Sequence, residues 1–334
     1  MKKVAVIGTT AWGTTLGVML ARNGLEVVLW ARTDEEASGM NASRENVAHL
    51  PGVTFPDKLN VTASPSDALQ EADLTILAVP SQNMRSNLHL VKEHLRGSTL
   101  ILSISKGIEI ETTKRMSEVI AEEVAPALRD RIAVLSGPNF AQEVVKGLPT
   151  ATVVASATPE FAREIQQGIS SLNFRAYFTE DVVGVEMGGA LKNIMAVSVG
   201  MSDGLGYGDN TRAALITRGL AEVTRLGVAA GANPLTFSGL AGIGDLIATC
   251  TSQLSRNHFV GQELARGRTL ESILTSMNGI AEGVDTTVAA LRLAGTLGVE
   301  MPITEQVYQV LLEGKAVKDA VRALMERELK HEGY

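Results

Sequence analysis

Short apolar runs alternate with helix-like stretches through the first 180 residues, and this alternation limits the possible folds more than any other feature. The first run, Val4–Ile7, is continuously apolar and ends in Gly8, which is typical of a strand buried in a parallel sheet. Leucines at helical spacing follow, and Asn23-Gly24 predicts the end of that helix. Further strands are predicted over 26–31, 74–79, 100–104, 132–135 and 151–155, with helices such as 114–124 between them. Strands that alternate with helices predict a doubly wound α/β domain.

The second half of the chain has a different character. Helical periodicity continues after about residue 180, and no convincing strand pattern remains there. The predicted helices cover residues 185–201, 212–230, 257–266, 270–277, 284–297 and 304–312. A chain of 334 residues is long enough for two domains. We therefore predict an α/β domain over residues 1–180 and an all-α domain over residues 181–334.

Charge and composition exclude several classes of partner. The net charge is −7, which argues against a nucleic-acid-binding protein and against a polybasic membrane anchor. In such an acidic chain, a local group of basic side chains suggests a small anionic ligand such as phosphate. Cys250 is the one cysteine, which suits a reducing, cytoplasmic environment. The five histidines show no metal-ligand spacing, so no metal site is predicted.

Two uncharged stretches need to be distinguished from export signals and membrane spans. Lys2-Lys3 and the uncharged residues 4–21 resemble a secretory signal, but glycines and threonines interrupt the apolar run. Residues 226–244 contain Pro234 and several glycines, which disfavours a membrane-spanning helix. We predict neither export nor membrane insertion.

The turn after the first strand carries a glycine pattern. In G-x-G-x-x-G turns, glycines permit a tight turn, close approach of the pyrophosphate and helix–strand packing. Here Gly8 and Gly13 occupy the first and third positions, and Thr10 occupies the second. The position of this turn after the first strand predicts a Rossmann-like, dinucleotide-binding domain. Alternatives are another nucleotide or a lost cofactor, and Thr10 could either bind phosphate or push the cofactor outward.

The end of the second predicted strand bears on the choice of cofactor. An acidic residue there would bind the ribose 2′-hydroxyl, whereas an arginine can accommodate a 2′-phosphate. The chain has Arg32 at this place and no acid until Asp34, which favours NADPH over NADH. Arg32 could also stack on adenine and leave both cofactors usable, or simply be a solvated surface residue.

The most informative candidate for catalysis is Lys192. It lies within residues 187–197, a segment otherwise suited to burial. Burial lowers the pKa of an ammonium, and a lysine with a lowered pKa can serve as a general acid or base. The alternative is that Lys192 extends from a helix surface into solvent.

Other polar residues stand in unusual places. Lys106 follows the strand predicted at 100–104, and Gly137 to Asn139 follow the strand at 132–135, where ligands of open α/β sheets bind. Asp245 lies alone in an uncharged, glycine-rich stretch. Ser255-Arg256-Asn257 offers a hydroxyl, a guanidinium and an amide in succession, a suitable set for phosphate. Together they supply an acid/base, a charge partner and an anion-binding group.

With these residues identified, the sequence resembles the NAD(P)-dependent glycerol-3-phosphate dehydrogenases of the bacterial and eukaryotic cytosolic type. The likeness runs from Val4 to about Glu313. The most specific matches are Leu191-Lys192-Asn193 with the loop 204–212, and the segments 239–249, 254–257 and 280–283. The resemblance implies reversible hydride transfer between sn-glycerol 3-phosphate and dihydroxyacetone phosphate, which would supply glycerol phosphate for phospholipid synthesis. It also implies a homodimer.

The resemblance also implies individual roles. Lys192 is the implied proton acceptor, with Lys106 and Asp245 beside it. The implied substrate contacts are Lys106, Gly137, Asn139, Lys192, Asp245, Ser255, Arg256 and Asn257. The implied cofactor contacts, including the glycine turn, are Gly8, Thr10, Ala11, Trp12, Gly13, Arg32, Lys106, Ala141, Arg256, Ile280 and Glu282. The chain departs from the family at Thr10 and Ala11, where glycine and serine are usual, and at Asn139, where serine or threonine is common.

Two other functions fit parts of the pattern. A β-hydroxy-acid dehydrogenase would also use a lysine of the helical domain, but the anion-binding group at 255–257 argues for a phosphorylated substrate. A non-catalytic nucleotide sensor would explain the altered glycine turn. Retention of every polar residue expected in the substrate site argues against it.

Overall fold

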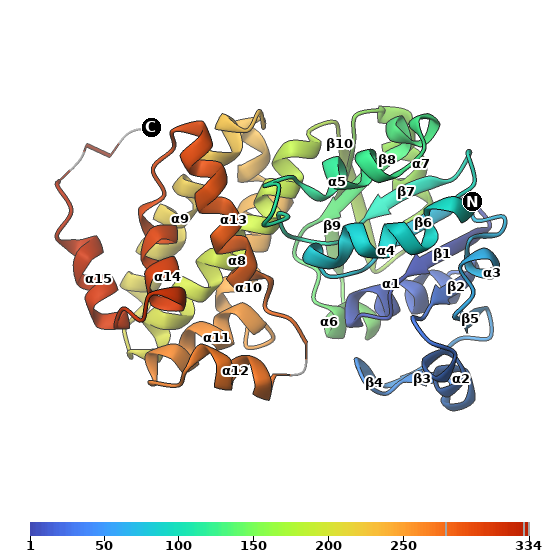
Figure 1. Ribbon diagram of the computed structural model, residues 1–334, viewed down its shortest axis with the longest axis horizontal. Coiled ribbons are helices and arrows are strands. Elements are labelled where there is room, and N and C mark those ends of the chain that lie inside the picture. The colour runs from blue at the N-terminus through green and yellow to red at the C-terminus, as the bar shows by residue number, and fades with distance from the viewer. Residues whose placement is uncertain (278, 330, 333–334) are drawn as a thin grey trace.

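The computed structural model describes residues 1–277, 279–329 and 331–332. Figure 1 shows an α/β half and a helical half lying side by side. The last strand of the α/β half, β10 (Phe174–Thr179), is followed directly by α8 (Val182–Gly204), which opens the helical half.

In the described part of the chain, eight strands form one sheet in the order β10-β9-β8-β7-β6-β1-β2-β5. Its other members are β1 (Lys3–Ile7), β2 (Glu26–Trp30), β5 (Leu59–Thr62), β6 (Leu74–Leu77), β7 (Leu100–Ser103), β8 (Ile132–Ser136) and β9 (Thr150–Ser156). The six strands from β5 to β8 are parallel and have the doubly wound order, which confirms the predicted fold class. The sheet is not wholly parallel, because β9 pairs antiparallel with β8 and parallel with β10.

Helices cover both faces of this sheet. They are α1 (Ala11–Arg22), α2 (Asp34–Ser43), α3 (Pro65–Leu69), α4 (Met84–Val91), α5 (Met116–Glu123), α6 (Ala141–Val145) and α7 (Pro159–Ile169). Alternate residues of β1 enter different cores: Val4 and Val6 pack in one, whereas Ala5 and Ile7 pack in the other. A strand buried on both faces explains why Val4–Ile7 is a continuous apolar run.

Two strands of the sheet and a small hairpin are not among the elements predicted from the sequence. β10 lies at the sheet edge and alternates buried Phe174 and Ala176 with exposed Arg175 and Tyr177, so it carries no continuous apolar run. β5 lies at the opposite edge and has only four residues. The hairpin pairs β3 (Glu45–Asn46), which has two residues, with β4 (Leu50–Thr54), which has five.

The helical half is arranged around α8. The helices packed on it are α9 (Asp209–Ala229), α10 (Asp245–Thr251), α11 (Arg256–Ala265), α13 (Glu282–Leu297) and α14 (Pro302–Leu312). Further out, α12 (Leu270–Ser276) packs on α11, and α15 (Val317–Met325) packs on α14. α8 is long and apolar enough to cross a membrane, but 78% of its most apolar window is buried inside the protein, as in a core helix. Close packing against α11 requires glycine, because a Cβ at Gly200 or Gly261 would collide with backbone atoms of the other helix.

Candidate active site

A cleft of about 640 Å³ lies where the two halves meet. Most residues proposed from the sequence line it, although they lie far apart along the chain. They are Gly8, Thr10, Ala11, Trp12, Arg32, Lys106, Asn139, Ala141, Lys192, Asp245, Ser255, Arg256, Asn257, Ile280 and Glu282. Gly13 and Gly137 are not among the lining residues. A Cβ at Gly13 would overlap the Ala78 side chain, so this glycine serves packing instead.

Lys192 lies on α8 and is 7% exposed, so burial rather than extension into solvent is correct. Two glycines bring this helix close to the rest of the site. A Cβ at Gly188 would collide with the Ala241 carbonyl oxygen, and a Cβ at Gly189 would collide with Ser136 Oγ. The Lys192 ammonium pairs with Asp245 Oδ1 and donates to Thr249 Oγ1 at 2.6 Å.

Asp245 is 1% exposed and connects two lysines from different halves of the protein. It is the first residue of α10, which follows the π-helical turn Leu240–Gly244. Gly242 has no room for a side chain in this turn, because a Cβ would overlap the Phe237 backbone. Asp245 Oδ2 accepts from Lys106 Nζ at 2.9 Å, while Oδ1 pairs with Lys192. One buried carboxylate thus balances two ammonium groups.

Lys106 enters the cleft from the loop after β7. Its Nζ also donates to the Gly137 carbonyl oxygen at 3.0 Å and to Asn139 Oδ1 at 2.9 Å. Gly137 has a φ of 142° and its Cβ would press on the Thr152 backbone, so the turn requires glycine. Gly137 and Asn139 therefore position Lys106, and the structure gives Gly137 this role rather than a place in the cleft wall.

The charges in the cleft shift one another's pKa. Burial lowers the pKa of the Lys192 ammonium to about 8; the Asp245 carboxylate opposes this shift, and the charge of Lys106 adds to it. Burial alone would raise the pKa of Asp245, but the two lysines outweigh it and hold that pKa below its usual value. Lys192 can therefore exchange a proton near neutral pH while Asp245 remains ionised.

The first turn of α11 faces the same cleft. Ser255 caps this helix, since its Oγ accepts from the His258 N–H at 3.2 Å. The first backbone N–H groups of a helix have no partner inside the helix and bind anions. Arg256 lines the cleft and is exposed; partial desolvation lowers the pKa of its guanidinium, while Glu282 opposes this shift. Asn257 is 8% exposed and is held on both sides of its amide. Its Nδ2 donates to Asn193 Oδ1 at 2.9 Å, and its Oδ1 accepts from the Gly283 N–H at 2.9 Å.

The glycine turn shows how the chain uses Thr10. Thr10 has a φ of −61°, which needs no glycine, and it caps α1. Its Oγ1 accepts from the Gly13 N–H at 3.2 Å and donates to the Ala78 carbonyl oxygen at 2.9 Å. The hydroxyl is therefore engaged within the protein and is not directed at a phosphate. Gly8 does require glycine, because its φ is 105° and a Cβ would press on the Ala78 carbonyl.

The start of α1 is suited to a dinucleotide. Ala11 and Trp12 begin the helix and line the cleft, so their backbone N–H groups are available to phosphate. Trp12 Nε1 is buried and has no hydrogen-bond partner among the described residues. Arg32 is exposed at the end of β2, where its guanidinium donates to Asn87 Oδ1 at 2.9 Å. These donors fit a pyrophosphate and an adenosine ribose.

Glu282 joins the two halves at the edge of the cleft. Its carboxylate accepts from the Ser81 backbone N–H at 3.0 Å and from the Ser81 hydroxyl. Burial raises the pKa of Glu282, and these hydrogen bonds together with Arg256 oppose the rise. Ser81 precedes α4, whereas Glu282 is the first residue of α13.

Several further polar residues of the cleft were not proposed from the sequence as site residues. Thr249 lies one helical turn after Asp245, and that i, i+4 spacing is a signal that could have identified it. Asn193 follows Lys192 directly. The Glu36 carboxylate accepts from Thr9 Oγ1 at 2.5 Å and from the Arg32 N–H at 3.1 Å. Glu36 stands three residues after Thr33, which is the spacing of a helix-capping pair, so the sequence carries a signal for a cap but none for a site. His49 lies in the β3–β4 hairpin, which has no sequence signal.

Other chemistry has little support in the described residues. No group of three or more His, Cys, Asp or Glu side chains that could hold a metal ion is found among them. Cys250 is fully buried, and burial raises the pKa of its thiol to about 12, so it stays a neutral thiol near the site.

Comparisons with known proteins agree with this geometry. The family model for the N-terminus of NAD-dependent glycerol-3-phosphate dehydrogenase matches residues 3–162, and the model for its C-terminus matches residues 181–322. The chain belongs to the NAD-dependent glycerol-3-phosphate dehydrogenase family. This family consists of oxidoreductases, so membership favours an enzyme over a nucleotide sensor and a phosphorylated substrate over a β-hydroxy acid.

Relatives match the chain nearly from end to end. The glycerol-3-phosphate dehydrogenase [NAD(P)+] of Dehalococcoides mccartyi is 53% identical over 333 residues, which cover 99% of this chain and 93% of the relative. The corresponding protein of Moorella thermoacetica is 50% identical, with 99% and 98% covered. The crystal structure of glycerol-3-phosphate dehydrogenase from Coxiella burnetii has a TM-score of 0.93 at 36% identity, with 98% and 99% covered.

Proposed function

We propose that this chain interconverts sn-glycerol 3-phosphate and dihydroxyacetone phosphate with NADH or NADPH. The observation that carries the proposal is one cleft containing both a buried lysine with a pKa of about 8 and, from a different helix, the anion-binding start of α11. The first group suits proton transfer at a carbonyl, and the second suits a phosphate. A three-carbon phosphoester offers both features.

In the oxidation of glycerol 3-phosphate, Lys192 as a neutral amine accepts the proton of the C2 hydroxyl. In the reduction of dihydroxyacetone phosphate, its ammonium form polarises the ketone and donates the proton. A nicotinamide cofactor held by the cofactor site would take up or supply the hydride. Asp245 and Thr249 orient Nζ, because both accept hydrogen bonds from it. This arrangement prepares a single amine for proton transfer.

Arg256, the Ser255 hydroxyl and the first N–H groups of α11 would hold the substrate phosphate. Binding energy at this remote phosphate would place the reacting carbon beside Lys192. Asn257 supports the group indirectly, since its side-chain amide already joins α8 and α13. Lys106 and Asn139 would contact the substrate between these two ends.

Gly8, Thr10, Ala11, Trp12, Arg32, Ala141, Ile280 and Glu282 would form the cofactor site. Gly13 would contribute through the packing of α1, and Lys106 and Arg256 would meet the cofactor from the substrate side. We also propose domains over residues 1–180 and 181–334, a cytoplasmic homodimer, and a role in supplying glycerol phosphate to phospholipid synthesis.

The direct test is an absorbance assay of reduced nicotinamide with the purified protein. Dihydroxyacetone phosphate should cause steady oxidation of NADPH or NADH, and 2-keto or 3-keto carboxylates of similar size should cause little. If the protein turned over a keto carboxylate rapidly and did not turn over dihydroxyacetone phosphate, the proposed substrate would be wrong. The activity would then be that of a hydroxy-acid dehydrogenase.

A preference for NADPH is proposed from Arg32, and Arg32→Ala tests it. The variant would lack the guanidinium that binds the 2′-phosphate, so its KM for NADPH should rise by about tenfold to a hundredfold. KM for NADH should change less than about threefold, because NADH has no such phosphate. Arg163→Ala, on the exposed face of α7, is the matched control. Equal increases for both cofactors would show that Arg32 does not read the 2′-phosphate.

A further inference from the structure

The β7–α5 segment, residues 104–115, joins the two halves of the protein and carries Lys106 into the cleft. Its Ile108 is fully buried in the core of the helical half, together with Met187 and Leu191 of α8. At its end, Glu186 of α8 accepts from the Arg115 guanidinium at 2.7 Å and from the Ser117 N–H at 2.8 Å. The segment belongs by sequence to the α/β half but packs on the helical half.

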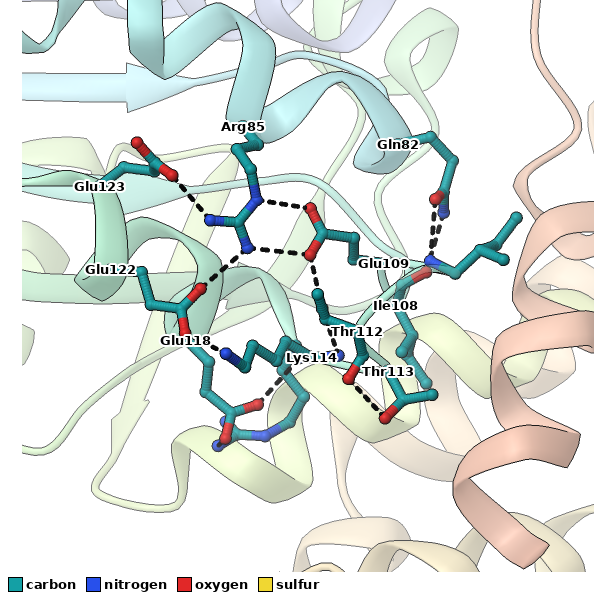
Figure 2. Close-up of polar contacts among 12 residues, drawn as sticks. Gln82, Arg85, Ile108, Glu109, Thr112, Thr113, Lys114, Glu118, Glu122 and Glu123 are labelled. Atoms are coloured by element: carbon teal, nitrogen blue, oxygen red, sulfur yellow. Dashed lines mark hydrogen bonds and ion pairs between the residues drawn. The ribbon is translucent and has the colours of Figure 1, made fainter. Parts of the chain in front are cut away.

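The amide of Gln82 holds this segment from the α/β side. Its Nε2 donates to the Ile108 carbonyl oxygen at 2.8 Å, and its Oε1 accepts from the Ile110 N–H at 3.0 Å. Figure 2 shows the Gln82 side chain directed at the backbone of the segment. Both ends of one amide are therefore engaged within four residues of Lys106.

The guanidinium of Arg85, the second residue of α4, provides a second attachment. It forms two parallel hydrogen bonds with Glu109, Nε to Oε1 at 3.0 Å and Nη2 to Oε2 at 2.9 Å. It is itself held by Glu123 at 2.7 Å and Glu122 at 2.9 Å, both on α5 (Figure 2). Glu109 is 8% exposed, so its position is fixed by a two-bond contact largely removed from water.

Between Lys106 and these attachments the backbone has little freedom. Gly107 packs so closely on Ser81 that a Cβ would lie 2.5 Å from Ser81 Cβ. Ser105 Oγ donates to the Val79 carbonyl oxygen at 2.5 Å on the other side of Lys106. Lys106 therefore lies in a tightly held stretch of backbone, and the contacts at Ile108 to Ile110 form the far end of that stretch.

We propose that Gln82 and Arg85 are positioning residues, which hold Lys106 where its ammonium contacts Asp245 and acts on Lys192. This inference rests on the proposed role of Lys106 in the cleft. Neither side chain lines the cleft, so each would act only through the β7–α5 segment. Because the positive charge of Lys106 lowers the pKa of Lys192, withdrawal of Lys106 should raise that pKa.

The test is a double-mutant cycle of Gln82→Leu and Lys106→Met, with kcat/KM for dihydroxyacetone phosphate as the readout. Gln82→Leu should lower kcat/KM by about tenfold or more, since displacement of a catalytic group by about 1 Å is costly. It should also move the alkaline limb of the pH profile to higher pH. In the Lys106→Met background, Gln82→Leu should change kcat/KM less than about twofold.

Gln166→Leu is the matched control, because it removes a comparable hydrogen bond, from Nε2 to the Ala176 carbonyl oxygen at 2.8 Å, between residues that do not line the cleft. It should leave kcat/KM and the pH profile unchanged. If Gln82→Leu does not fold, Arg85→Lys replaces it in the same cycle, since lysine keeps the charge but cannot form the two-bond contact with Glu109.

The outcomes separate this inference from the proposed function. Equal losses from Gln82→Leu in both backgrounds, or a pH profile that does not move, would overturn the positioning role. Wild-type kinetics in Gln82→Leu beside a strongly impaired Lys106→Met would do the same and leave the role of Lys106 intact. Near-normal turnover in Lys106→Met would instead remove the role of Lys106 on which the inference rests.

Discussion

Lys192→Met is expected to lower kcat by about 10²-fold to 10⁴-fold in both directions of the reaction, the range typical of a lost general acid or base. Methionine matches the length and burial of lysine but cannot accept or donate a proton. Asp245 keeps its partner Lys106, so the buried carboxylate is not left without a counter-charge. Steady-state kinetics and the KM of the cofactor, which should stay near its normal value, provide the measurement.

Lys58→Met is the matched control for this experiment. The Lys58 ammonium likewise donates to a protein oxygen, the Gly24 carbonyl oxygen at 2.7 Å, but Lys58 lies on the surface outside the cleft. Its turnover should be unchanged. A folded Lys192→Met protein that retains near-normal kcat would remove Lys192 from proton transfer.

Arg256→Met is expected to lower kcat/KM for dihydroxyacetone phosphate by about 10²-fold, as expected for hydrogen bonds to a charged phosphate. With dihydroxyacetone, which has no phosphate, kcat/KM should be low for the native protein and nearly the same for the variant. The ratio of kcat/KM for the two substrates, measured for both proteins, isolates the contribution of the phosphate. Inorganic phosphate or phosphite added with dihydroxyacetone should stimulate only the native protein.

The comparison of substrates works because the two ends of the substrate would meet chemically different groups. The amine of Lys192 would act at the reacting carbon, and the guanidinium of Arg256 would act at the phosphate. Equal losses from Arg256→Met with both substrates would contradict a role in phosphate binding. Such a result would indicate instead that Arg256 acts through the cofactor or through Glu282, whose carboxylate influences its pKa.

The parts of the fold that are buried on both sides were predictable from sequence. β1, β6, β7 and β8 are almost wholly buried and mostly apolar, because helices cover both sheet faces. The reversal of β9 could not be predicted, since Thr150–Ser156 has the same buried, β-branched character in either direction. Register and direction depend on partners distant in sequence.

The candidate site was predictable at positions where a charged residue stands in an otherwise uncharged stretch of sequence. A lysine within an apolar helix and an aspartate within a glycine-rich stretch both predicted a functional role, and both line the cleft. The role of Thr10 was not predictable, because only the structure shows the Ala78 carbonyl that receives its hydroxyl. The contact between Ser81 and Glu282 spans 201 residues and left no local pattern.

The pH dependence of kcat/KM in both directions tests the central role of Lys192 most directly. Burial lowers the pKa of Lys192 to about 8, so the two directions should depend on pH in opposite ways. The kcat/KM for oxidation of glycerol 3-phosphate should rise above about pH 8, where the amine becomes neutral. The kcat/KM for reduction of dihydroxyacetone phosphate should fall over the same range. The substrate phosphate titrates near about pH 6, well below this window. Two limbs with a common pKa of about 8, both lost in Lys192→Met, are the expected result. Limbs of the same sign, or a limb that persists in Lys192→Met, would contradict it.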